Sequence, residues 1–281
     1  MDLQIVDGWK VGPKEARSRT HAARLVIPPD DFAAHSPFLL MAEDWFAPPA
    51  GFPTHPHRGM ETVTFVLEGE LEHKDHTGGH GVLQAGAVQF MTAGNGVLHS
   101  EMPGPEGVHS LQLWLNLPAA LKRTPAQYND RHLSATLLHE AAGVTARLYS
   151  GQLGNHVLPH GSTWPLTVID LTLEAGARYS LPLPAGQRAF IYLLSGDVMP
   201  GANAVAMPAE SVAITEVGPA RTGTDMLPIT AVTAARAIVC ASPPIDEPVV
   251  ARGPFVMNSE DEIAEAFADY RAGRLTEIRA G

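Results

Sequence analysis

Short runs of alternating apolar and polar residues, separated by glycine-containing turns, fill residues 51–117. Residues 62–67 (TVTFVL) are β-branched and aromatic, and the turn EGE follows them. Residues 111–117 (LQLWLNL) alternate with a period of two, which predicts a strand with one buried face. Because the predicted strands start roughly ten residues apart, the pattern favours an all-β barrel or sandwich.

One convincing helix is predicted, over residues 259–272 near the end of the chain. Ser259 and Glu262 have the spacing of a capping box, and Gly273 follows as a stop signal. The apolar positions of this helix that share one face are Ile263, Phe267 and Tyr270. We therefore expect the helix to pack against a barrel.

The second half of the chain repeats the first at an offset of 127 residues. Residues 55–70 (HPHRGMETVTFVLEGE) align with residues 182–197 (PLPAGQRAFIYLLSGD), strand over strand and turn glycine over turn glycine. A polar stretch over residues 118–135, broken by two prolines, reads as the crossover between the copies. A duplicated β unit is the simplest explanation, and it predicts domains over residues 1–130 and 131–281.

The two copies differ at the positions that carry chemistry. His55, His57 and Glu61 of the first copy correspond to prolines 182 and 184 and to Arg188 of the second. The second copy keeps the strands and lacks the candidate ligands. We therefore expect chemistry in the first domain and a structural or regulatory role for the second.

Composition narrows the classes of partner. The chain has 281 residues and a formal net charge of −11, which argues against non-specific binding to nucleic acid or to an anionic membrane. A single cysteine, Cys240, rules out an intrachain disulfide and a cysteine-rich zinc site. No apolar run reaches the ~18 residues of a membrane span, and the first residues lack an apolar leader segment, so we expect a cytoplasmic protein.

Two histidine-containing motifs bracket the first β unit. His55-Pro56-His57 opens it, and His99-Ser100-Glu101 closes it. Side chains two apart on a strand point to the same face, so each pair projects together, and a barrel brings the two pairs to one interior point. Three imidazoles and a carboxylate there predict a divalent transition-metal site, the alternative being a hydrogen-bonded polar cluster.

The identity of the carboxylate ligand is open at this level. Glu61 stands four residues after His57 and competes with Glu101. Residue spacing alone does not choose between them.

The stretch HPHRGMETVTFVLEGELEHKD, the stretch GAVQFMTAGNGVLHSEMP and the segment GPFVMN at residues 253–258 resemble the pirin family of the cupin superfamily. The resemblance covers nearly the whole chain. It implies an all-β bicupin, with two jelly-roll cupin barrels, a short C-terminal helix and metal in the N-terminal barrel only.

The resemblance also implies the ligand set. The family's metal ligands fall on His55, His57, His99 and Glu101, and the implied metal is Fe(II). Glu61 then becomes a residue that orients a ligand histidine. The chain departs from the family pattern at Asn95, where arginine is common, and this puts the substrate preference in question.

Some pirins resemble quercetin (flavonol) 2,3-dioxygenases in activity. The implied reaction uses O2: the flavonol 3-hydroxyl transfers its proton to Glu101, and the ring opens with loss of carbon monoxide. Candidate walls for an aromatic substrate are among Phe65, Phe90, Met91 and Leu113, although ordinary core packing is the favoured interpretation of any one of them.

Two other readings remain. Other family members resemble iron-dependent regulators, which sense redox state and act through a protein partner such as a transcription complex or a metabolic enzyme. A metal site that acts on some other small molecule is the third possibility. A cavity beside the metal, large enough for a substrate, would distinguish an enzyme from a regulator, because an enzyme requires one.

Overall fold

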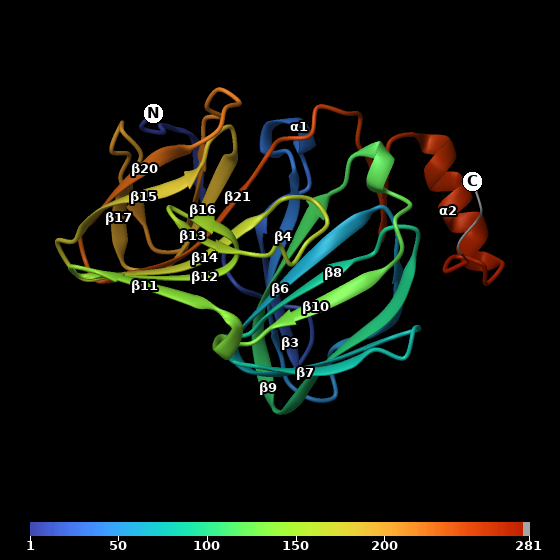
Figure 1. The fold of residues 1–281 in the computed structure, drawn as a ribbon. Helices are drawn as coiled ribbons and strands as arrows, with labels where there is room; N and C mark the ends of the chain where they lie inside the picture. The colour runs from blue at the N-terminus through green and yellow to red at the C-terminus, as the bar shows by residue number, and fades with distance from the viewer. Residues whose placement is uncertain (278–281) are drawn as a thin grey trace. The chain divides into compact units, whose positions relative to one another are not determined.

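The computed structural model describes residues 1–277, and its backbone contacts divide into two compact units (Figure 1). The 134–244 unit consists of Met1–Gly12, Ser134–Gly161 and Pro165–Pro244. The 13–133 unit consists of Pro13–Leu133, Ser162–Trp164 and the segment from Ile245 onward.

This division differs from the predicted domains at both ends of the chain. Strand β1 (Ile5–Lys10) pairs antiparallel with β19 (Ser211–Thr215), so the first residues belong to the 134–244 unit. The segment from Ile245, which includes the C-terminal helix, belongs to the 13–133 unit. Both differences come from pairings between residues far apart in sequence, which local periodicity does not encode.

The 134–244 unit contains two antiparallel sheets among the described residues. Their orders are β1-β19-β16-β21-β14-β12-β11, with β13 added to β12, and β15-β20-β17-β18. The remaining strands are β11 (Leu137–Ala141), β12 (Val144–Leu153), β13 (His156–Leu158), β14 (Thr167–Leu173), β15 (Arg178–Pro184), β16 (Arg188–Ser195), β17 (Asp197–Pro200), β18 (Met207–Pro208), β20 (Thr224–Ala231) and β21 (Ala235–Ser242). Aliphatic side chains from both sheets form one core, among them Leu148, Ile169, Leu171, Leu181 and Leu227.

The 13–133 unit is built on a sheet of order β10-β8-β6-β9-β4-β3-β2, with β5 added to β9 and β7 to β6 (Figure 1). These strands are β2 (Glu15–Ala16), β3 (His21–Ile27), β4 (Phe38–Phe46), β5 (Phe52–His57), β6 (Met60–Asp75), β7 (His80–Gln84), β8 (Val88–Thr92), β9 (Val97–Asn116) and β10 (Gln127–Arg131). The short helical segments are α1 (Phe32–His35) and the 3-10 turns Ala119–Leu121 and Leu133–Ala135.

Strands β6 and β9 pair along almost their whole length, and their register shifts near Gly69. Gly69 has φ of +75°, and a β-carbon there would lie 2.1 Å from the carbonyl oxygen of Gly107, so only glycine fits. The irregularity separates two halves of each long strand. The half of β9 from His99 to Pro103 pairs with β6 beyond the bulge, and the half from Ser110 to Asn116 pairs with β6 before it.

The C-terminal segment closes this unit. Strands β22 (Val250–Arg252) and β23 (Phe255–Met257) form a hairpin, and α2 (Glu260–Arg271) follows (Figure 1). Ile263 and Ala266 pack with Phe255 in a small apolar cluster. The predicted helix is confirmed, with Ser259 as its N-cap, although Tyr270 of the expected apolar face is 42% exposed. The predicted all-β class with one substantial helix is also confirmed.

Candidate metal centre

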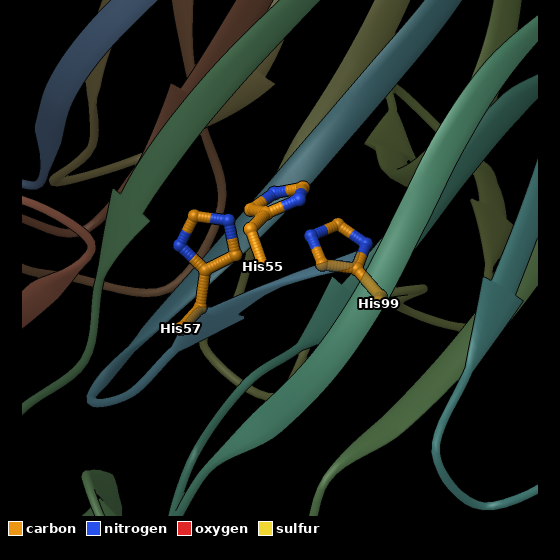
Figure 2. Close-up of side chains that lie close together, drawn as sticks. All are labelled: His55, His57 and His99. Carbon is orange, nitrogen blue, oxygen red and sulfur yellow. The ribbon is translucent and has the colours of Figure 1, made fainter. Parts of the chain in front are cut away.

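The histidine motifs lie on neighbouring strands. In the antiparallel pair β5–β9, His55 stands opposite His99, and Pro56 stands opposite Leu98. Pro56 keeps the backbone extended, so His55 and His57 project from the same face of β5. Figure 2 shows the three imidazole rings turned toward one another.

The three rings are close enough to share one ion. Their centroids are 4.9 Å apart for His55 and His57, 4.3 Å for His55 and His99, and 5.1 Å for His57 and His99. One ring nitrogen from each lies within 4.8 Å of the others. The structure thus brings together three of the four predicted ligands.

Each ring has its Nδ1 atom engaged. Nδ1 of His55 is 2.8 Å from the Pro53 carbonyl oxygen, and Nδ1 of His57 is 3.3 Å from that of Pro254. A carbonyl oxygen only accepts hydrogen bonds, so the proton of both rings is on Nδ1 and the lone pair is on Nε2. The Nε2 atoms of His57 and His99 are buried without a hydrogen-bond partner. Buried ring nitrogens that face a common point and have no hydrogen-bond partner are what a site for a divalent metal requires.

The electrostatics also keep the rings of His57 and His99 neutral. Burial, followed by the nearby His55, lowers the pKa of His57 to about 3. Burial and the neighbouring histidines hold the pKa of His99 well below its usual value. Neutral imidazoles are the form that binds metals, so the environment favours ligation over protonation.

Glu101 lies two residues beyond His99 on β9 and is 2% exposed. Its carboxylate does not belong to the group of converging ligand atoms. It accepts hydrogen bonds from Gln112 Nε2, at 3.0 and 2.8 Å, and from the Thr64 hydroxyl, at 3.3 Å. Glu101 is therefore held beside the histidine cluster by neutral donors.

Glu61 has a different role from the one expected. Its carboxylate accepts from the Thr92 hydroxyl at 2.5 Å and from the backbone N–H groups of Thr163 and Trp164 at 2.7 and 3.0 Å. Because it is three residues from Thr64 on β6, it points to the opposite face of that strand. The expectation that Glu61 orients a ligand histidine is wrong; it fixes the 162–164 segment.

Asn95 also faces away from the cluster. Its side chain donates to the Glu277 carbonyl oxygen at 2.7 Å, and its own carbonyl accepts from Arg58 Nε. Arg58 is 1% exposed and pairs with Asp269 of α2 at 3.0 Å. Arg58, which follows the HPH motif, thus connects the end of β5 to the C-terminal segment.

Three of the four candidate substrate walls point away from Glu101. Phe65 is adjacent to Thr64, and Leu113 is adjacent to Gln112, so both point away from Glu101. Phe90 pairs with Val63 and shares that face. The fourth, Met91, pairs with Thr62 and lies on the face that carries Thr64. Strand alternation defines two faces and does not say which one the metal site uses.

Sequence reasoning missed two neighbours of the site. Trp114 has its ring edge-on to His57, with centroids 5.2 Å apart, and its indole N–H donates to Gln112 Oε1 at 3.3 Å. His73, on β6, is fully buried with its Nε2 atom 3.2 Å from Nδ1 of His99. The period-two pattern of 111–117 marked Trp114 and Gln112 as sharing a face, and this was the available signal.

An acid–imidazole pair lies farther along the same sheet face. His21 Nε2 is 2.7 Å from an oxygen of Asp44, whose partner across the β4–β9 pair is Ser110. Asp44 is 5% exposed, and burial raises the pKa of its carboxyl. His21 also lines a cavity of about 570 Å³.

Two cavities stand out among the described residues of the 13–133 unit. The larger, about 570 Å³, is lined by His21, Trp45 and Phe46 among others, and by none of the three clustered histidines. The smaller, about 280 Å³, is lined by apolar residues: Pro29, Phe32, Leu39, Leu40, Trp114, Ala251, Gly253 and Val256. Trp114 lines this apolar cavity and also contacts the ring of His57.

Comparisons with known proteins agree with the geometry. The Pirin family model matches residues 26–115, and the model of the pirin C-terminal cupin domain matches residues 168–276. Pirin of Homo sapiens is 38% identical over 249 residues, covering 84% of this chain and 81% of that protein. Pirin-like protein 2 of Arabidopsis thaliana is 40% identical over 242 residues, covering 85% and 75%.

Among solved structures, a quercetin 2,3-dioxygenase from Acinetobacter baumannii superposes with a TM-score of 0.87 and 29% identity, covering 99% of this chain and all of that one. Over residues 1–277, no helix is long and apolar enough to cross a membrane. The three imidazoles, with a carboxylate held alongside, fit a divalent first-row metal.

Proposed function

Because this chain belongs to the pirin family, a group of two-barrel cupins, we propose that it is a metal-dependent dioxygenase that opens the ring of a flavonol with O2. The similarity to a quercetin 2,3-dioxygenase over nearly the whole chain supports this reaction class. The substrate is then a small, flat aromatic molecule with an acidic hydroxyl group.

One observation carries the proposal: the buried Nε2 atoms of His57 and His99, which have no hydrogen-bond partner, converge with the ring of His55 next to a buried carboxylate. In this proposal His55, His57, His99 and Glu101 hold Fe(II). The metal, when bound, supplies a Lewis acid and a one-electron redox centre, and its incomplete protein ligation leaves room for substrate.

The chain's own residues supply binding and proton transfer. Glu101 accepts the proton of the flavonol 3-hydroxyl, as a carboxylate general base. Gln112 and Thr64 donate to Glu101 and fix the direction in which its free lone pairs point. The cavity of about 280 Å³ beside Trp114 is apolar and suits an aromatic ring.

The first test is anaerobic reconstitution with Fe(II), followed by O2 uptake and quercetin absorbance. A His99→Ala variant removes a ligand, and a His80→Ala variant is the matched control, because His80 lies on the surface of the β7 hairpin. We expect metal-dependent loss of quercetin in the wild type and in His80→Ala, and none in His99→Ala. Full turnover in His99→Ala, or no turnover with a filled iron site, contradicts the dioxygenase proposal.

The second candidate is a metal-dependent regulator that acts through a protein partner. The contacts that favour it are those from the HPH motif to the C-terminal segment: His57 to the Pro254 carbonyl and Arg58 to Asp269. Metal loading then orders residues 253–277 and changes the surface that α2 presents. Hydrogen exchange in this segment should slow on metal loading; equal exchange with and without metal contradicts the regulator.

A further inference from the structure

His73 is a buried polar side chain at the metal site for which neither the fold nor the proposed reaction accounts. It lies on β6 beyond the bulge, where its partner across the β6–β9 pair is Glu101. It is 0% exposed, and its ring packs against Tyr128 with centroids 5.2 Å apart. Burying an imidazole is costly unless its hydrogen bonds are used, and in this ring Nε2 has a partner in His99 whereas Nδ1 is buried without one.

The contact between His73 and His99 admits one arrangement of protons if His99 binds a metal. A metal-binding Nε2 atom carries a lone pair, so the proton of neutral His99 is on Nδ1. Nδ1 of His99 lies 3.2 Å from Nε2 of His73, which must then accept, with the His73 proton on its own Nδ1. In the reverse arrangement His73 donates, and the proton of His99 sits on Nε2 and blocks ligation.

His73 is not itself a member of the cluster. The converging ligand atoms come from His55, His57 and His99, and Nε2 of His73 is occupied by its contact with His99. Its effect on a metal therefore passes through the His99 ring.

We propose that His73 is a positioning residue of the metal centre: it accepts the Nδ1–H of His99 and so fixes both the tautomer and the orientation of that ligand. This inference rests on the proposed metal site. It deepens the proposed function by adding a residue that tunes metal affinity without touching the metal.

A comparison of His55 and His57 with His99 shows why His73 matters for His99. His55 and His57 donate Nδ1–H to the carbonyl oxygens of Pro53 and Pro254, which are acceptors that no side-chain substitution removes. His99 alone among the three takes its anchor from a side chain. One substitution can therefore release one ligand and leave the other two in place.

Loss of such an outer-shell acceptor lowers metal affinity by about 10–100-fold in other histidine sites. A glutamine at position 73 places a carbonyl oxygen near the position of Nε2 and restores an acceptor. A leucine fills similar space with no acceptor. The pair separates hydrogen bonding from packing.

The experiment measures the Kd for Co(II) by chelator competition, with the Co(II) absorption spectrum as a second readout. The proteins are wild type, His73→Leu, His73→Gln and the surface control His80→Leu, each checked by thermal unfolding without metal. We expect His73→Leu to raise the Kd by about 10–100-fold with a changed spectrum. We expect His73→Gln to recover most of the affinity and His80→Leu to match the wild type.

An unchanged Kd in His73→Leu overturns the inference and leaves the dioxygenase proposal standing. Equal weakening in His73→Leu and His73→Gln also overturns it, because a packing role predicts that result. If the Kd values of the four proteins fall in the predicted order but the wild type does not turn over quercetin, the role of His73 stands and the proposed reaction is contradicted.

Discussion

Gln112 donates to both carboxylate oxygens of Glu101, at 3.0 and 2.8 Å, from the other half of the same strand. The bulge near Gly69 and the bend of β9 bring these two side chains together although they are eleven residues apart. Trp114 in turn donates to the Gln112 carbonyl oxygen, so an indole, an amide and a carboxylate form one chain beside the histidines. An amide donor to a buried carboxylate stabilises its charged form.

Replacing Gln112 by leucine should therefore destabilise the protein. The substitution leaves the buried Glu101 with the Thr64 hydroxyl as its recorded donor, and an under-satisfied buried acceptor costs about 1–3 kcal/mol. Denaturant unfolding of the metal-free protein measures the loss. A double variant with Glu101→Leu should recover part of it; a double variant that simply adds the two losses argues against coupling.

Glu101→Gln should separate metal binding from proton transfer. The three histidines keep their positions and the glutamine carbonyl oxygen can take the place of the proposed carboxylate ligand, so we expect metal to bind still. Glutamine cannot act as a base, so turnover should fall by about 10²–10⁴-fold. Metal content and quercetin loss are measured on the same sample. Retained turnover with full metal content contradicts the role of Glu101 as base.

Arg58→Met should be among the most destabilising single changes in the 13–133 unit. Arg58 and Asp269 are 1% and 2% exposed, and removing Arg58 leaves the buried carboxylate with the more distant Arg274, at 3.7 Å, so the loss should approach the roughly 3–5 kcal/mol of a broken buried ion pair. Urea unfolding measures the effect. The double variant Arg58→Met with Asp269→Leu should be more stable than Arg58→Met alone, and a less stable double variant would contradict the argument.

The metal-free protein should lose stability as pH falls below neutrality. Unfolded histidine takes up a proton near pH 6.5, whereas buried His57 has a pKa of about 3, so between these values the unfolded state binds more protons. One such residue costs about 2 kcal/mol between pH 6.5 and 5. Denaturant titrations of wild type and His57→Gln measure it, and we expect the shallower pH slope in the variant. An equal dependence of stability on pH in the two proteins contradicts the lowered pKa of His57.

The strand pattern was sufficient to predict the histidine cluster because the relevant geometry is local. His55 and His57 project from the same face because they stand two residues apart on an extended chain. The short β5–β9 pairing then places His99 opposite His55. The C-terminal helix was predicted for a similar reason, since its cap and stop signals lie within it.

The misplaced features depend on register. Strand alternation does not say which face of a strand meets the metal, so Phe65, Phe90 and Leu113 were kept as candidate walls beside the favoured interpretation of core packing, and the structure buries all three in the core. His73 reaches His99 only because the register shifts beyond Val66. The first residues belong to the 134–244 unit, and the segment from Ile245 belongs to the 13–133 unit. This arrangement likewise depends on pairings between distant residues, such as β1 with β19.

The contacts of His57 and Arg58 with the C-terminal segment also set an order of events during protein synthesis. His55, His57 and His99 leave the ribosome well before Pro254, Asp269 and Leu275, which hold His57 and Arg58 in place. A nascent chain that has emerged only to the end of the first barrel has its ligands and lacks part of what orients them. The proposed metal site is therefore fully supported only at the stage at which residues 253–277 have emerged and docked.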